Sequence, residues 1–277
     1  MNHRTMRLVL SCAMLSILTP AVAAPPDSQQ FTGRTAASAS VELRSRVSGY
    51  LTNVLFKDGS EVQEGQVLFQ IDARPYQADL DRARAAVVSA EAQLKVAETG
   101  YKRIQDLARK GVVSPEEIDK VAAEIPVARA GVASARAERT LAEFRLDSTR
   151  IRAPISGHIG QRLLDVGNLV RADRTSLARI IKDDPLYVYF DVDEITVLRL
   201  RRAAADNDKG NSLDRLPVQI GLAGERGFPH TGIVDFVSST VNAQSGSLQV
   251  RALLPNTKHI FMPGMFARVR ITQGRSP

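Results

Sequence analysis

The residue types that most often do chemistry are few in this chain, and they lie far apart. Histidine binds metal ions and exchanges protons near neutral pH, but it occurs only at His3, His158, His230 and His259. No two of these have the spacing of a metal-binding motif such as HExxH. The sequence therefore predicts no metal site, and it favours surface or turn positions for the three histidines after His3.

One acidic cluster, at Asp191, Asp193 and Glu194, is the other place where chemistry is conceivable. Neighbouring carboxylates can bind a divalent ion or act as general acid and base. A solvated strand end is the commoner reason for such a cluster. The sequence also has no nucleophile-elbow, phosphate-loop or dinucleotide motif. We therefore predict no catalytic site, no cofactor and no enzymatic activity.

The first 23 residues predict export from the cytoplasm. Arg4 and Arg7 precede an apolar stretch at 8–18, and Ala21-Val22-Ala23 offers a small-residue cleavage site. The apolar stretch is shorter than the roughly 20 residues that span a bilayer. The pattern favours a cleaved signal peptide over an uncleaved anchor.

The only cysteine, Cys12, lies inside this segment, so the mature chain would have no thiol. The apolar run before Cys12 is too short for a lipid-attachment signal, and we expect no lipid anchor. An exported chain without cysteine fits a bacterial periplasm. The net charge of +7 is spread along the chain without a basic patch containing aromatic residues, so we expect no nucleic-acid partner.

Two segments on either side of the middle of the chain repeat one pattern. Residues 47–51 read Val-Ser-Gly-Tyr-Leu, and residues 155–159 read Ile-Ser-Gly-His-Ile. A second glycine follows at the same spacing in both, so the turn positions Gly49 and Gly59 correspond to Gly157 and Gly167. Such agreement is the mark of a structural repeat. Each half is too small to bury both its faces, so we expect the two to close onto each other as a flattened barrel or sandwich.

The segment between the halves predicts a long helical hairpin. From Tyr76 to Ala108, apolar residues recur in alternating steps of four and three, which is the seam of a coiled coil. Gly111 is a plausible end signal for this helix. Ser114 is then the N-cap of a second helix, with Glu117 completing a capping box. Each helix has a little over 30 residues and would be roughly 50 Å long at 1.5 Å per residue.

The second helix is less regular than the first. Its seam runs from Ile118 to Ala135, after which we expect Arg139 to break the register and Leu141 and Phe144 to carry the apolar face onward. Pro126 lies inside the helix, where it removes a backbone hydrogen bond at a cost of about 3 kcal/mol. Since the seam continues on both sides, we predict one bent helix, with two separate helices as the alternative.

A β pattern returns after the second half-motif. Residues 186–192 alternate strictly, 193–205 predict a short helix, and four further short strands follow before the end. Short strands joined by glycine and proline turns favour a small barrel. The predicted fold is α+β: a split lipoyl-like barrel-sandwich (31–75 and 150–183), an inserted α-helical coiled-coil hairpin (76–149) and a small antiparallel β-barrel (184–274).

Lipoyl and biotinyl domains use a similar pair of half-motifs, with a modified lysine in the turn between them. Here the helical hairpin replaces that turn, and no lysine occupies the expected position. A swinging-arm carrier is therefore not expected.

Several segments together carry a family resemblance, namely residues 33–35, 41–51, 68–72, 152–157, 167–170, 184–192 and 263–266. The chain resembles the periplasmic adaptor subunits, or membrane fusion proteins, of RND-type multidrug efflux pumps. The resemblance covers nearly all of the chain after the first 23 residues. It implies a scaffold that joins an inner-membrane RND pump to an outer-membrane channel and that assembles as a ring of identical subunits in the periplasm.

Arg103, Leu107 and Ser114 have the spacing of the hairpin tip in this family. The resemblance implies that these three residues dock on the outer-membrane channel. Ser114 also has a structural reason to be present as an N-cap, and Leu107 flanks the seam. Arg103 has no such structural need.

One departure from the family concerns its membrane-proximal domain, which is built from residues near both ends of the chain. Only residues 31–39 remain here for its N-terminal share, because the sequence stops at Pro277. Pump contact would rest on the barrel, or the chain is truncated. The alternatives are an adaptor of an ABC-type or metal efflux system and, more distantly, a periplasmic binding or chaperone protein.

Overall fold

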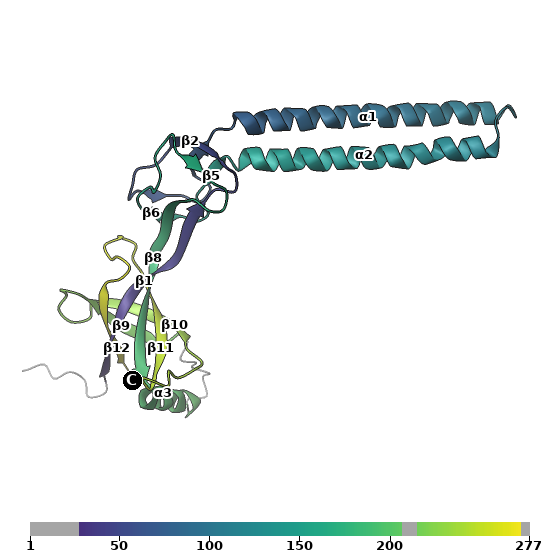
Figure 1. Cartoon of the computed structure of the whole chain (residues 1–277). Coiled ribbons are helices and arrows are strands. Elements are labelled where there is room, and N and C mark those ends of the chain that lie inside the picture. Colours follow the sequence, from purple (N-terminus) through teal and green to yellow (C-terminus); the bar gives the residue numbers. More distant parts are fainter. Residues whose placement is uncertain (1–27, 207–214, 273–277) are drawn as a thin grey trace, which may run out of the picture.

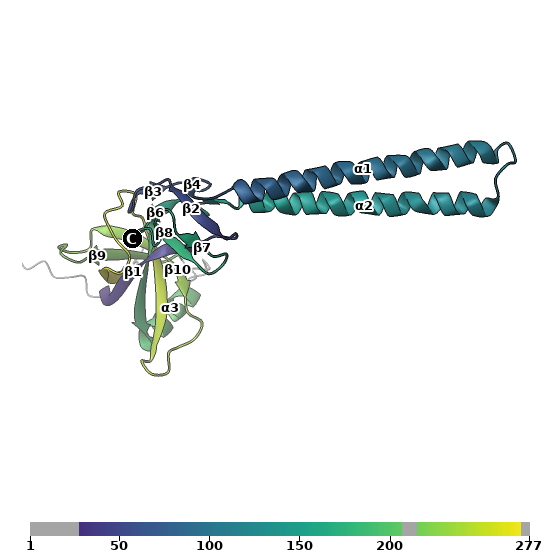
Figure 2. The ribbon, with the colours of Figure 1, turned by 45° about the horizontal axis from the view of Figure 1, so that its top comes forward.

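The computed structural model describes residues 28–206 and 215–272. The predicted signal peptide, with His3 and Cys12, lies outside these ranges. Two long helices form a hairpin, a small β domain lies at its base, and a larger β-barrel follows (Figure 1). Figure 2 shows that the hairpin and the barrel project from the small β domain in different directions. Within the described part of the chain, no helix is both long enough and apolar enough to cross a bilayer.

The small β domain is built from both halves of the sequence repeat. The first half supplies β2 (Gly49–Val54), β3 (Glu61–Val62) and β4 (Val67–Ile71). The second half supplies β5 (Arg150–Arg152), β6 (Gly157–Ile159) and β7 (Leu169–Val170). β2 pairs with β7, β3 with β6 and β4 with β5, all antiparallel. β2 also pairs with β4 within the first half, so the order of this sheet is β5-β4-β2-β7, and strands of the second half flank those of the first.

The sequence repeat corresponds to an internal twofold in this domain. The N–H of Gly59 donates to the carbonyl of Ile159 at 3.0 Å, and the N–H of Gly167 donates to the carbonyl of Leu51 at 2.8 Å. These two bonds join equivalent positions of the two halves. Gly59 and Gly167 have φ angles of 77° and 92°, a left-handed conformation that glycine adopts without steric cost.

Gly49 and Gly157 occupy the other equivalent pair, at the starts of β2 and β6. A methyl group at Gly49 would lie 2.6 Å from the Ile71 side chain, and one at Gly157 would collide with the carbonyl oxygen of Ile181. Both positions therefore require the close backbone approach that only glycine permits.

Two long strands join the small β domain to the barrel. β1 (Ser28–Arg44) and β8 (Ser176–Asp193) run antiparallel to each other through both domains. The first residues of β1, from Ser28 to Arg34, pair with β12 (Phe266–Thr272) in the barrel. The prediction that residues 31–39 belong to a separate membrane-proximal part is therefore wrong, because this stretch is a barrel strand that continues into the small domain.

The barrel closes through six strands. The remaining ones are β9 (Pro217–Leu222), β10 (His230–Val237) and β11 (Ser247–Leu254), and the order β1-β12-β9-β10-β11-β8 is completed by the pairing of β8 with β1. Alternate residues of these strands point inward to an aliphatic core that includes Leu186, Val218, Ile220, Ala252 and Val269. The helix α3 (Glu194–Asp206) lies at one end of the barrel (Figure 1). The α+β fold predicted from the sequence is thus confirmed.

Candidate functional site

The helical hairpin is the most prominent feature and is held together along a narrow seam. α1 (Arg74–Ala108) and α2 (Pro115–Asp147) lie side by side and point away from the β domains (Figures 1 and 2). The buried seam positions are Leu80, Val87 and Ala97 on α1 and Val132, Ala135 and Ala142 on α2. Because half of these are alanines, the two helices approach closely. The predicted hairpin is confirmed, and α1 begins two residues before the predicted Tyr76.

α2 corrects two sequence expectations. It is continuous through Pro126, so the alternative of two separate helices is wrong. The seam also does not shift at Arg139: Ala142 is buried, whereas Leu141 and Phe144 are 48% and 49% exposed. Arg139 occupies the seam position between Ala135 and Ala142, where the steps of four and three continue unbroken. Helical periodicity, rather than side-chain hydrophobicity, decides which residues face α1.

Two ion pairs bridge the helices and mark their register. Arg136 lies 2.6 Å from Glu91, and Arg129 lies 3.7 Å from Glu98. All four side chains are about half exposed, so each pair contributes little free energy, on the order of 0–1 kcal/mol. Glu98 lies nearer the tip than Glu91 on α1, and its partner Arg129 lies nearer the tip than Arg136 on α2. The two pairs therefore fix the antiparallel register of the helices.

The tip itself is a short turn organised by backbone hydrogen bonds. The carbonyl of Leu107 accepts the N–H of Lys110 at 3.1 Å and that of Val112 at 3.3 Å. Gly111 takes a left-handed φ of 73°, as its predicted role as an end signal requires. The hydroxyl of Ser114 accepts the N–H of Glu117 at 3.3 Å, which confirms Ser114 as the N-cap of α2.

The three predicted docking residues all lie at this far end of the hairpin. Arg103 and Leu107 are one helical turn apart, so they share a face of the last two turns of α1. Ser114 lies across the turn, at the start of α2. Arg103 is exposed and forms no ion pair with another residue of the described ranges, whereas the nearby Arg109 lies 3.6 Å from Asp106. Leu107 is 36% exposed. The tip thus offers a free guanidinium, able to bind a carboxylate or carbonyl oxygen, beside an apolar side chain.

The acidic cluster has a structural role at one of its members. The carboxylate of Asp193 accepts the N–H of Thr196 at 2.9 Å and its hydroxyl at 2.7 Å, so it caps the first turn of α3. These hydrogen bonds from Thr196 lower the pKa of Asp193. Asp191 and Glu194 are exposed. The arrangement is that of a helix start.

The histidines are less scattered than their sequence positions indicate. His230 lies 2.7 Å from Glu225 in the barrel. His158 and His259 both lie 3.2 Å from the carboxylate of Asp183, which is 7% exposed. Sequence reasoning missed this cluster because its members are 25 and 76 residues apart and share no motif.

Burial and the two histidines have opposite effects on the pKa of Asp183. Burial by itself would raise the pKa of the carboxyl group, but hydrogen bonds from His158 and His259 outweigh it, and the pKa of Asp183 lies below its ordinary value. Asp183 is therefore an anion at neutral pH, in contact with two imidazole rings that also pack against each other.

Comparison with known proteins covers nearly the whole described chain. Residues 39–182 match the barrel-sandwich hybrid domain of RND membrane fusion proteins, and residues 185–275 match the β-barrel domain of the same proteins. The chain is 36% identical over 253 residues to the efflux pump periplasmic linker BepD of Brucella suis, covering 89% of this chain and 63% of BepD. It is 33% identical over 249 residues to the multidrug efflux pump subunit AcrA of Escherichia coli, covering 90% of this chain and 63% of AcrA.

The fold has a close counterpart among solved structures. The membrane fusion protein Spr0693 of Streptococcus pneumoniae superposes with a TM-score of 0.67 at 16% identity, covering 89% of this chain and 99% of that one. At this identity the likeness concerns the fold alone. The chain spans about 63% of the length of BepD and of AcrA.

Proposed function

Since the chain belongs to the membrane fusion proteins of RND-type efflux systems, we propose that it is a periplasmic adaptor that joins an inner-membrane RND pump to an outer-membrane channel. The transported compounds would be drugs or other small molecules, and AcrA is named as a subunit of a multidrug efflux pump. The adaptor itself would do no chemistry, and the pump would supply the energy.

The observation that carries the proposal is the free-standing hairpin. α1 has 35 residues, which corresponds to about 52 Å at 1.5 Å per residue. The hairpin leaves the small β domain at one end and has no further domain at the other (Figure 1). A helical pair of this length is suited to reach a distant partner through its tip.

The side chains at the tip support a protein partner. Arg103 forms no ion pair within residues 28–206 and 215–272, and Leu107 is partly exposed. The backbone around them is fixed by the turn at Gly111 and the cap at Ser114.

The turn also presents Val112, which is 72% exposed, and the exposed Lys110. A turn with a fixed backbone that presents cations and apolar groups loses little conformational freedom on binding. We propose that Arg103 and Leu107 make the contacts to the outer-membrane channel, with Ser114 shaping the turn and lining the same surface.

Replacing Arg103 and Leu107 together by aspartate tests this assignment. The double variant should lose cross-linking to the outer-membrane channel in cells, because a cation and an apolar contact become two anions. Its far-UV circular dichroism and thermal unfolding should match those of the wild type, since neither side chain is buried.

A matched control is available on the same helix. Lys95 and Thr99 are both exposed, have the same spacing of four residues, and lie two turns nearer the base. Lys95→Asp with Thr99→Asp should leave cross-linking intact. Channel cross-linking that survives the tip variant, or that is lost equally in the control, would show that the tip does not dock.

Exposed apolar residues outside the tip support association of identical subunits. Tyr50 and Leu169 are register partners on β2 and β7, and they are 60% and 48% exposed. Leu163 and Val166, in the loop before β7, are also more than half exposed. On the hairpin, Val88, Val96 and Val127 are at least two-thirds exposed beside the seam. We propose that these surfaces lie between neighbouring subunits of a ring.

Leu169→Asp tests the ring contact. The substitution should reduce the average mass in sedimentation velocity toward that of a monomer, because a charge would be buried at the contact. Thr231→Asp, at an exposed position on β10 of the barrel, serves as the control. An unchanged distribution for Leu169→Asp, at a concentration where the wild type associates, would place the subunit contact elsewhere.

A further inference from the structure

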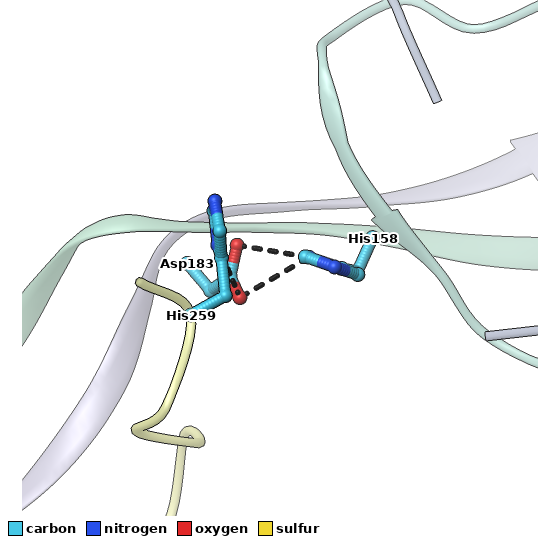
Figure 3. A group of neighbouring side chains, drawn as sticks. All are labelled: His158, Asp183 and His259. Atoms are coloured by element: carbon cyan, nitrogen blue, oxygen red, sulfur yellow. Dashed lines mark hydrogen bonds and ion pairs between the residues drawn. The ribbon is translucent and has the colours of Figure 1, made fainter. Parts of the chain in front are cut away.

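His158, Asp183 and His259 come from three different parts of the fold. His158 is in β6 of the small β domain, Asp183 is in the long connecting strand β8, and His259 is in the loop between β11 and β12 of the barrel. Figure 3 shows both imidazole rings next to the carboxylate, and the two rings also pack edge to face with their centroids 4.9 Å apart. The cluster thus lies where the small β domain meets the barrel.

The distances in the cluster fit a small metal ion. Nδ1 of His158 is 3.2 Å from each carboxylate oxygen of Asp183, and Nδ1 of His259 is 3.2 Å from one of them. One ligand atom from each residue lies within 4.8 Å of the other two. Ligands bound at about 2.0–2.2 Å in a tetrahedron are roughly 3.3–3.5 Å apart. The nitrogen–oxygen spacing is therefore already close to that of a tetrahedral edge.

The supporting residues hold the ligands in place. Asn256 is 3% exposed, and its side chain donates to the backbone carbonyls of Asp183 at 2.9 Å and Phe261 at 3.0 Å. The backbone carbonyl of Asn256 accepts the backbone N–H of His259 at 2.7 Å. Asn256 therefore ties the His259 loop to the strand that carries Asp183. Such outer contacts orient metal ligands and raise metal affinity.

His259 also has an unusual backbone conformation. Its φ is 49°, in the left-handed region that few residues other than glycine adopt. The loop thus accepts a local conformational cost that directs this imidazole toward Asp183. Residues held in such conformations cluster at functional sites.

The cluster borders a cavity with room for solvent. The cavity has a volume of about 380 Å³ and is also lined by Arg179, Phe261 and Met262. Water can therefore reach the cluster and supply a fourth ligand. Apart from the two histidines, the lining has one basic side chain, Arg179, and it is exposed. Two neutral imidazoles and one carboxylate would still give the ligand set a net negative charge.

We propose that His158, Asp183 and His259 bind one divalent transition-metal ion, with Zn²⁺ as the best fit, and that this ion clips the small β domain to the barrel. Two imidazoles and one carboxylate suit Zn²⁺, Co²⁺, Ni²⁺ or Cu²⁺ better than the oxygen-seeking Mg²⁺ or Ca²⁺. Three protein ligands leave a fourth position for water, as in open zinc sites. The site joins residues from both domains, so the bound ion would restrict their relative motion.

Calorimetric titration of the untagged chain with Zn²⁺ tests the site. The wild type should bind one ion per chain, and His158→Ala, His259→Ala and Asp183→Asn should each weaken binding by at least about tenfold. Glu225→Gln is the matched control, because it alters another histidine–carboxylate pair of the same barrel and leaves the His230 ring packed on Phe261. Its affinity for Zn²⁺ should equal that of the wild type.

Substitution by Co²⁺ gives a second readout that needs no variant. A tetrahedral site with two imidazoles should give visible absorption that saturates at one equivalent and disappears on adding Zn²⁺. The metal proposal is overturned if the wild type takes up less than one ion, or if the three variants bind as tightly as the wild type. In that case the cluster is a hydrogen-bonded structural triad.

Hydrogen exchange tests the clip separately. Zn²⁺ should slow amide exchange in residues 256–262 of the barrel loop in the wild type. The effect should vanish in His158→Ala, although that substitution lies in the other domain. Binding of Zn²⁺ without slower exchange in this loop would overturn the clip, and equal slowing in His158→Ala would show that the two domains are not joined through the ion.

Discussion

At the scale of single residues, Asp72 illustrates how one ion pair fixes the entry to the hairpin. Its carboxylate accepts the backbone N–H of Arg74 at 3.1 Å and the guanidinium at 2.6 Å, just as α1 begins. The side-chain hydrogen bond from Arg74 is the main cause that lowers the pKa of Asp72 to about 2. The charged form of Asp72 is therefore the form that makes the hydrogen bonds at the start of α1.

This pair predicts a particular pH dependence. Because the pKa of Asp72 is lower in the folded chain than in the unfolded one, its contribution to stability is complete above about pH 4. It should be lost as the pH falls toward 2. A carboxyl-detected NMR titration should find the Asp72 midpoint near 2 and move it upward in Arg74→Ala. An Asp72 midpoint near the ordinary value in the wild type would contradict the pair.

The residue scale is also where the sequence was least informative. The N-cap role of Ser114 follows from its position before a proline and two acids, and the structure confirms it. The grouping of His158, Asp183 and His259 depends on how two strands, β6 and β8, and the loop between β11 and β12 meet in space. No local spacing encodes that meeting, so the predicted surface or turn positions of His158 and His259 did not include their contacts with Asp183.

At the scale of elements, the hairpin seam was predictable over most of its length because it obeys a strict period. The prediction failed at positions where apolar residues do not follow the steps of four and three. Leu141 and Phe144 are apolar but lie on the outer face, whereas Arg139 lies in the seam. Phe144 instead contacts the small domain, with the guanidinium of Arg46 5.6 Å from its ring centre. Whether a residue faces α1 is therefore decided by its angular position around the helix axis and not by the chemical type of its side chain.

Arg139 should be a weak point of the seam. Its Nε atom is buried and makes no hydrogen bond among the described residues; its polar contact is a long ion pair, 3.5 Å to Oε1 of Glu143. Arg139→Met keeps most of the apolar length and removes the unsatisfied donor, so it should stabilise the chain by about 1 kcal/mol. Urea unfolding followed by circular dichroism measures the change.

Lys120→Met is the control for Arg139→Met. Lys120 is exposed on the same helix, so its replacement should change the unfolding free energy by less than about 0.5 kcal/mol. A loss of stability in Arg139→Met would show that the Arg139 guanidinium has a favourable role that its Nε environment does not reveal.

At the scale of the whole molecule, the hairpin is an insertion into a domain that is closed without it. β4 and β5 pair directly, and the N–H of Ile71 donates to the carbonyl of Thr149 at 2.9 Å. The two ends of the hairpin therefore leave the small domain side by side. The twofold repeat, visible in the sequence, explains why the halves find each other across more than 70 intervening residues.

Removing the hairpin should leave the β part folded. Replacement of residues 74–147 by a short glycine–serine turn should preserve the strand signal in circular dichroism and a cooperative thermal transition. Hydrogen-exchange protection in β4 and β8 should be retained. Loss of that protection would mean that the small domain needs α1 and α2 for its own stability.

The length of the hairpin makes the geometry of its base decisive. A lever of about 52 Å converts a tilt of about 5° at its base into a displacement of roughly 4.5 Å at its end, close to one helical turn. The hydroxyl of Tyr76, which donates to the carbonyl of Ser48 at 2.6 Å, braces this pivot. The position of Arg103 at the tip is therefore determined by the stiffness of a few contacts at the opposite end of the hairpin, such as that between Tyr76 and Ser48.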